Sequence, residues 1–340
     1  MTYDLKRITD KIKKDFGSAS IAGDTPDPQD YISTGNKAVD LMCGGRGIPF
    51  GYIVEWAGLS GSGKTLMLQQ MLAIAQREYN AIGVWLDREN AFFNQRAEEL
   101  NIDIEQTIIV KPVDIPTVYT AEKFLVATLG SIMEKYPDAF IFCCIDSLSA
   151  FDSGQDGEEM GRKAKALHSL FRKLTSYLGP KMAMQFSNQV TFKPGIMFGD
   201  PRTTTGGEAP KYYSTFRIFL DDVKPITSGD EIIGNWIKVD LKKTRLGPAD
   251  RKVYIPFYYR EGISELGGYA RMLVNRGILE AKNKTEFKAF KQSTVKYDDI
   301  QYNEFRPEKF LDKHPELLLN TWPGDGIRND TETETIEEDS

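Results

Sequence analysis

The chain has 340 residues, of which 41% are hydrophobic and 27% are charged, and its formal net charge is −6. This composition is typical of a globular chain of about two domains, and its overall charge does not attract nucleic acid, so such a partner requires a local basic patch. No apolar run reaches the roughly 18 residues that span a membrane. The three cysteines and two histidines have neither zinc-site nor disulfide-framework spacing. We therefore expect a cytoplasmic protein without a membrane partner.

The first 34 residues combine a helix with a linker. Apolar residues recur about one turn apart on a basic helix, at Leu5, Ile8, Ile12 and Phe16. Residues 17–30 break this pattern with glycines and prolines, as a linker does. The apolar stripe must be buried against another surface, and a neighbouring subunit and the chain's own core are equally compatible with the sequence. We assign residues 1–34 to subunit contact.

Residues 35–262 alternate apolar strands with helices. Strands are predicted at YIVEWAG (52–58), AIGVWLD (81–87), AFIFCCID (139–146) and MAMQFSNQ (182–189). Helices are predicted at 65–79, 94–100, 121–136 and 160–178. This alternation indicates an α/β fold with a mostly parallel central sheet flanked by helices. Further strands at 215–223, 235–244 and 252–259 extend the sheet in antiparallel fashion, whereas residues 195–213 fit neither helical nor strand periodicity.

The C-terminal region divides into two parts. Residues 263–320 are expected to form a small α+β domain, in which AKNKTEFKAFKQSTVK (281–296) carries five lysines against one glutamate. This stretch is a candidate patch for double-stranded DNA, and a solvated surface helix is equally compatible with it. Residues 321–340 form an acidic tail whose last twelve residues hold six acidic groups and no basic one. We expect this tail to be disordered.

A phosphate-binding motif follows the first strand of this core. The sequence GLSGSGKT matches G-x-x-x-x-G-K-[ST] between a predicted strand and a predicted helix. In that context the backbone N–H groups and the helix dipole hold the phosphates of ATP, Lys64 reaches the β- and γ-phosphates, and Thr65 ligates Mg²⁺. The predicted nucleotide-binding residues of the motif and the helix start are Gly58, Leu59, Ser60, Gly61, Ser62, Gly63, Lys64, Thr65 and Leu66.

Polar residues at the ends of the other strands complete this site. Asp146 ends a buried strand and is suited to hold Mg²⁺. Both Asp87 and Glu89 lie near the tip of the preceding strand, and we choose Glu89 as the residue that positions the attacking water because it lies further out. Gln189 ends a third strand, where its amide can hydrogen-bond a γ-phosphate, although satisfying the loop backbone is an equal alternative.

These motifs carry a family resemblance. The segments ISTGNKAVDLM, GIPFGYIVEWAG, GSGKT, AQREY, DRENA, IDS, SNQ and IMFGDPRTTTGGEAPKYY occur in the order and spacing of one family. In them the chain resembles the RecA family of ATP-dependent DNA strand-exchange recombinases, and more distantly the phage recombinase UvsX. The similarity extends from about residue 8 to residue 280.

The resemblance implies two DNA-binding loops that face single-stranded DNA. The first, SGQDGEEMG, leads into the helix at 160–178, and the second is the threonine- and glycine-rich stretch at 195–213. Hydroxyls and backbone N–H groups suit a protein that accepts any sequence, because they bind phosphates without reading bases. The implied contacts are Met160, Lys165, Arg172, Lys193, Met197, Thr203, Thr204, Thr205, Gly206 and Gly207.

The resemblance also implies an ATP site shared between subunits. Lys243 and Arg245 are expected to reach the nucleotide of the adjacent subunit, with Lys242 as an alternative to Lys243, and Tyr212 is expected at the subunit boundary. Arg96 stands where relatives place a residue against adenine. Two departures concern the second loop, where Thr191 and Pro194 replace a basic residue and an aliphatic wedge. They put the geometry of the bound DNA in doubt.

The sequence thus predicts a DNA-dependent ATPase that forms helical filaments on single-stranded DNA and catalyses strand exchange in recombination and repair. ATP and Mg²⁺ are the expected cofactors, and single-stranded DNA, double-stranded DNA and further copies of the chain are the expected partners. Two alternatives remain at this point: a ring-forming motor of helicase type, and a filament protein that coats DNA but exchanges strands poorly.

Overall fold

A computed structural model of the chain describes residues 4–16, 22, 27–151, 160–193, 195, 200–291, 294–297, 300–303 and 308–322. The predicted contact Met197, the position Pro194 and nearly all of the predicted acidic tail therefore lie outside the described residues. Met160 is described only through its backbone, as the first residue of a helix. Within the described residues, no helix has the length and apolar character needed to cross a membrane.

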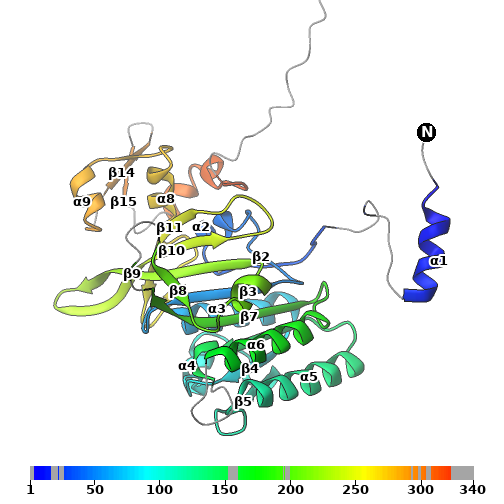
Figure 1. Cartoon of the computed structure of the whole chain (residues 1–340). Coiled ribbons are helices and arrows are strands. Elements are labelled where there is room, and N and C mark those ends of the chain that lie inside the picture. The colour runs from blue at the N-terminus through cyan, green and yellow to red at the C-terminus, as the bar shows by residue number, and fades with distance from the viewer. Residues whose placement is uncertain are drawn as a thin grey trace, which may run out of the picture.

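A twisted sheet of ten strands organises the core (Figure 1). Its main strands are β3 (Ile53–Gly58), β4 (Ile82–Asp87), β5 (Thr107–Val110), β6 (Ile141–Asp146), β7 (Met182–Phe192), β9 (Phe216–Ser228), β10 (Glu231–Lys243), β11 (Arg251–Tyr258) and β12 (Gly262–Ile263), in the spatial order β12-β11-β10-β9-β3-β7-β6-β4-β5. The pairings from β9 to β5 are all parallel. Those from β9 to β12 are antiparallel. The predicted α/β fold is confirmed.

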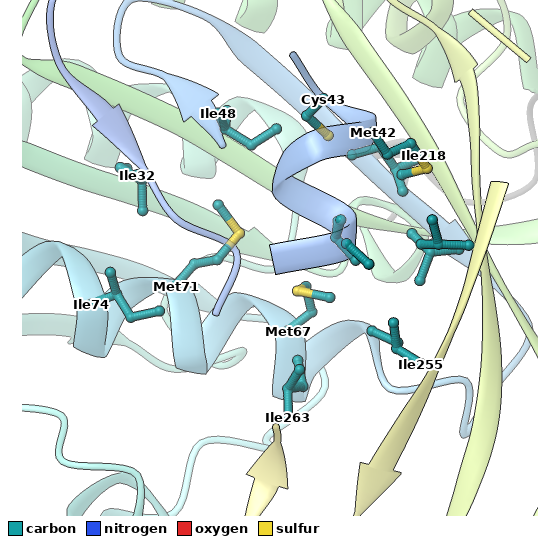
Figure 2. Packing of buried hydrophobic residues seen from close by; sticks show 14 of the residues in the cluster. Ile32, Met42, Cys43, Ile48, Met67, Met71, Ile74, Ile218, Ile255 and Ile263 are labelled. Atoms are coloured by element: carbon teal, nitrogen blue, oxygen red, sulfur yellow. The ribbon is translucent and has the colours of Figure 1, made fainter. Parts of the chain in front are cut away.

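Helices cover both faces of the sheet. The main ones are α2 (Lys37–Met42), α3 (Lys64–Tyr79), α4 (Asn94–Glu99), α5 (Val118–Lys135) and α6 (Met160–Thr175). Figure 2 shows one face, where Met67 of α3 lies near Ile255 and Ile263 of the sheet. The leucines of α5 and α6 pack on the other face. Side chains alternate along a strand, so the neighbours Cys143 and Cys144 enter opposite clusters.

The stretch at 195–213 contains regular structure that its local pattern did not predict. β8 (Arg202–Thr204) pairs antiparallel with the end of β7, in the register Val190↔Thr204 to Phe192↔Arg202. A short helix, α7 (Ala209–Tyr213), follows. The absence of regular structure expected here is therefore wrong for these two segments. Pairing with a distant strand organises β8, and a window of local sequence does not contain that partner.

The remaining elements lie at the two ends of the chain. They are α1 (Lys6–Phe16), β1 (Tyr31–Ile32), β2 (Ile48–Pro49), α8 (Tyr269–Asn275), β13 (Glu280–Ala281), α9 (Lys284–Lys288), β14 (Thr294–Tyr297), β15 (Ile300–Asn303) and α10 (Glu308–Leu311). Strands β13, β14 and β15 form a separate antiparallel sheet, as expected for a small α+β unit. Arg271 of α8 joins this unit to the core, because its guanidinium lies 3.9 Å from the ring centroid of Phe287 and 5.1 Å from that of Trp236.

Candidate active site

The loop between β3 and α3 has the geometry of a phosphate cradle. Gly61 and Gly63 adopt φ angles of 81° and 86°, which lie in the left-handed region. A Cβ on Gly63 would lie 2.2 Å from the ring of Phe257, so the position also requires glycine for space. Lys64 Nζ donates to the carbonyl oxygens of Gly58 and Leu59 at 3.1 and 2.7 Å. Burial lowers the pKa of Lys64, while nearby carboxylates act in the opposite direction.

Oxygen ligands for a cation gather beside the start of α3. Thr65 Oγ1 donates to Asp146 Oδ2 at 2.8 Å, and the Ser187 hydroxyl donates to the other carboxylate oxygen. Burial raises the pKa of Asp146, and the carboxylates of Glu89 and Asp87 act in the same direction. A buried carboxylate beside like charges gains most from a nearby cation. One carboxylate and one hydroxyl also fit Mg²⁺, which takes its other ligands from water and phosphates.

The structure separates the two carboxylates at the tip of β4. Asp87 is buried, accepts from the backbone N–H groups of Ala91 and Phe92 at 2.9 and 3.1 Å, and pairs with Lys111 at 3.1 Å. Glu89 is exposed and lines the cavity beside the phosphate loop. Asp87 therefore holds the turn after β4, which leaves Glu89 as the carboxylate of this strand tip that lines the cavity.

A cavity of about 330 Å³ joins most of the predicted nucleotide residues. Its lining includes Ser60, Gly61, Gly63, Lys64, Thr65 and Leu66 of the loop, together with Glu89, Arg96 and Gln189. The sequence did not point to five further lining residues, Gln69, Asn235, Ile237, Phe257 and Tyr259. The exposed ring of Tyr259 and the guanidinium of Arg96, which donates to the Arg260 carbonyl at 2.8 Å, both lie at this cavity.

A buried polar network continues from the cavity to β8. Asn188, the neighbour of Gln189, donates to Glu55 Oε1 and to the Thr205 carbonyl, both at 2.9 Å. The Thr205 hydroxyl donates back to Asn188 Oδ1 at 2.6 Å. Arg217 pairs with the other oxygen of Glu55 and donates to Thr204 Oγ1 at 3.1 Å. The strand end that bears Gln189 is therefore hydrogen-bonded to the base of the second predicted DNA loop.

This network changes the roles expected for two of the loop threonines. Thr204 is 5% exposed and its hydroxyl accepts from Arg217, while the Thr205 hydroxyl is bonded to Asn188. Both belong to the stem of the loop rather than to a surface that offers hydroxyls to phosphate. Thr203 and Gly206 are half-buried, and Gly207 is exposed. The two glycines approach α6 closely, since a Cβ on Gly206 would lie 2.8 Å from Leu167 Cδ1.

The basic residues predicted to contact DNA are exposed. Lys165 and Arg172, seven positions apart on α6, share one helix face, and Lys193 follows β7. The opposite side of α6 buries Leu167, Phe171 and their neighbours in the core. The helix therefore presents cations to solvent while its packing is complete.

The predicted trans cations lie outside the cavity. Lys243 Nζ donates to the carbonyls of Lys211 and Ser214 at 2.5 and 2.8 Å, and Arg245 donates to the carbonyl of Tyr212 at 2.5 Å. The Tyr212 side chain is 66% exposed. Lys242 instead pairs with Asp240 at 3.0 Å and Asp200 at 3.3 Å, facing the stem of the second loop. Lys243 and Arg245 therefore both bind backbone carbonyls of α7 or of the residue that follows it, whereas Lys242 pairs with carboxylates elsewhere.

A parallel sheet whose strand ends carry a phosphate loop, a buried carboxylate beside its threonine and an exposed glutamate is the arrangement of a P-loop ATPase. The family model of the RecA N-terminal domain matches residues 4–264. The chain is 32% identical over 317 residues to Protein RecA of Colwellia psychrerythraea, covering 90% of this chain and 87% of that protein. It is 30% identical over 325 residues to Protein RecA of Clostridioides difficile, covering 92% and 88%. The chain therefore belongs to the RecA family, and it is a DNA-dependent ATPase and recombinase.

Replacing Asp87 by alanine is expected to destabilise the fold by roughly 2–4 kcal/mol, because two backbone N–H groups and Lys111 lose their partner. The change Glu89→Ala, two residues away, removes only the acceptor of the Ser147 hydroxyl and is expected to cost about 1 kcal/mol. Urea unfolding of both variants measures the difference. Equal stabilities would contradict the structural role assigned to Asp87.

Proposed function

We propose that the chain binds ATP with Mg²⁺ in the cavity beside the phosphate loop and couples its hydrolysis to a filament on single-stranded DNA. The observation that carries this proposal is the hydrogen-bonded path from Gln189 through Asn188 to Thr205, which joins the nucleotide cavity to the stem of the second loop. The proposed division of the chain is 1–34, 35–262, 263–320 and 321–340. Membership of the RecA family does not favour the ring-forming helicase or the passive DNA coat.

Each side chain in the cavity has a proposed task. Lys64 binds the β- and γ-phosphates, and Thr65 with Asp146 holds Mg²⁺, which when bound neutralises charge on the phosphates. Glu89 orients the attacking water and accepts its proton. Tyr259 and Arg96 hold the base between an aromatic ring and a guanidinium plane. Gln189 senses the γ-phosphate, and any movement of its strand end reaches Thr205 through Asn188.

The proposed partner on α6 and the second loop is the backbone of single-stranded DNA. Lys165, Arg172 and Lys193 supply charge, and Thr203 with the N–H groups of Gly206 and Gly207 supplies neutral donors. Thr204 and Thr205 link the loop to the ATP site instead of binding DNA. Four exposed lysines of the C-terminal unit support a separate contact with double-stranded DNA: Lys282, Lys284, Lys288 and Lys291.

The proposed filament contact uses α1 of one subunit. Leu5, which precedes the helix, and Ile8 and Ile12 within it form one apolar stripe and are 49%, 57% and 41% exposed. An apolar hollow of about 730 Å³, lined by side chains that include Ile108, Tyr136 and the carboxylate of Glu105, offers a matching surface on the core. Its rim carries two carboxylates, Glu105 and Asp138, against one lysine, Lys135, and the carboxylates can face the basic side of α1. Assembly would also bring Lys243 and Arg245 to the neighbour's nucleotide.

Glu89→Gln is expected to bind ATP normally and lose at least about 100-fold in hydrolysis, because the amide cannot accept the proton of water. Arg245→Ala is expected to bind ATP but lose DNA-stimulated hydrolysis, because its cation serves the neighbouring site. Mixed filaments of the two variants are expected to recover activity at junctions that unite an intact Glu89 with an intact Arg245. Wild-type turnover by Glu89→Gln, or no recovery in filaments shown to contain both, would contradict these roles.

Ile8→Asp is expected to abolish filaments while leaving the fold stable, because it places a charge in the middle of the stripe that the neighbour buries. The matched control is Thr9→Asp, which adds the same charge to the same helix and leaves the residues of its basic face unchanged. Electron microscopy with ATP and single-stranded DNA, together with urea unfolding, measures both effects. Normal filaments of Ile8→Asp would place the contact elsewhere.

Lys165→Ala and Arg172→Ala are each expected to weaken binding of single-stranded DNA irrespective of its sequence. Each lost phosphate contact is expected to reduce the slope of log K against log salt by about 0.7. The control is Lys123→Ala on α5, which lies over the ring of Tyr119 and takes no part in the proposed site. Unchanged affinity and slope in both α6 variants would move the DNA contact away from this helix.

A further inference from the structure

Two hydroxyls, one on the buried Ser147 and one on the half-buried Ser149, support the exposed carboxylate of Glu89. Ser147 Oγ donates to Glu89 Oε1 at 2.5 Å, and Ser149 Oγ lies 2.6 Å from Ser147 Oγ. A serine hydroxyl has one proton to donate, and a carboxylate only accepts. Because Ser147 gives its proton to Glu89, Ser149 must be the donor in the contact between the two hydroxyls. The relay therefore runs from Ser149 through Ser147 to Glu89.

Two cations hold the segment that carries these hydroxyls. Arg88, the neighbour of Glu89, donates to the carbonyl of Ala150 at 2.7 Å and lies 5.0 Å from the ring centroid of Phe151. Lys163 Nζ donates to the carbonyl of Ser149 at 2.8 Å. Lys163 belongs to the first turn of α6. The backbone that presents the hydroxyls is thus bonded on one side to the chain of Glu89 and on the other to α6.

The helix that holds Lys163 also carries the proposed DNA cations. Lys165 and Arg172 lie on the exposed face of α6, and Lys163 reaches inward from its start. A displacement of α6 by DNA would therefore be transmitted to the carbonyl of Ser149 and then through the two hydroxyls. Displacements of about 1 Å at a reacting group are sufficient to change rates by up to about 100-fold. None of these contacts involves Gln189 or the second loop.

We propose that Ser147 and Ser149 are positioning residues for Glu89, and that Lys163 makes their geometry respond to DNA bound on α6. Bound DNA would then affect the ATP site through two routes, one at the end of β7 and one at the end of β6. This inference rests on the proposed role of Glu89 in hydrolysis. It adds a source of DNA control that is independent of the path through Asn188.

The hydroxyl relay is tested by Ser147→Ala and Ser149→Ala in the full chain with saturating single-stranded DNA. We expect kcat to fall by about tenfold in the first and about threefold in the second, with the KM for ATP within about twofold of wild type, because orientation and not binding is lost. Ser149→Thr keeps a hydroxyl donor and is expected to restore kcat. The control is Ser176→Ala, whose hydroxyl donates only to the Lys173 carbonyl at the far end of α6. Urea unfolding shows whether Ser147→Ala has a folding defect. If it has one, the kcat of Ser149→Ala alone tests the role of the hydroxyl relay.

The link to α6 is tested by Lys163→Met against Lys163→Arg, with Lys123→Met as the control on another helix. We expect Lys163→Met to keep its ATPase rate without DNA and its DNA affinity within about twofold, and to lose at least about threefold of the stimulation at saturating DNA. Lys163→Arg retains a donor and is expected to retain stimulation. Full stimulation of Lys163→Met, or a loss that disappears at saturating DNA, would overturn the proposal. If Glu89→Gln is inactive while the serine and lysine variants are normal, only this inference fails; if Glu89→Gln is active, the proposed function fails first.

Discussion

The register of the parallel strands is the constraint on which the site depends. Gly58 lies opposite Gln189, and Asp87 lies opposite Asp146, so the strands end at one common edge. Parallel strands place their carboxyl ends together, and a ligand at that edge meets groups from several distant parts of the chain. A one-residue slip would turn each side chain to the other face of the sheet. The buried apolar faces that fix this register therefore also fix the chemistry.

A buried ion pair connects this edge to the stem of the second loop, which is proposed to bind DNA. Glu55 is fully buried in β3 and pairs with Arg217, whose side chain is 13% exposed. Burying such a pair costs desolvation free energy that is recovered only when the remaining donors and acceptors are satisfied. Asn188 and Thr204 supply those partners. Removing any one of the four groups would leave at least one donor or acceptor of its buried neighbours without a partner, so the groups of this network depend on one another.

Local sequence patterns pointed to most of the residues that line the cavity, because these residues follow strands that are themselves recognisable. GLSGSGKT needs only its own strand and helix, and Asp146 needs only the apolar run before it. Tyr259 and Asn235 were not predicted, because antiparallel strands far along the chain bring them to the cavity. The different roles of Asp87 and Glu89 follow from the ion pair of Asp87 with Lys111 and from its hydrogen bonds in the turn after β4. Sequence spacing shows neither of these contacts. β8 likewise depended on its pairing with β7.

An ionic cluster at β8 makes the stem of the second loop rigid. Arg202 pairs with Asp200 at 2.7 Å, with Asp221 at 2.6 Å and with Asp240 at 3.3 Å, and it holds the pKa of Asp200 well below its usual range. The guanidinium lies over the ring of Phe219 and is 13% exposed, so salt screens these pairs less than surface pairs. The stem is therefore already ordered without DNA, and binding need not order it again. The same rigidity would allow a small movement at Gln189 to reach the residues proposed to face DNA, because a stiff hairpin transmits a displacement that a flexible chain would absorb.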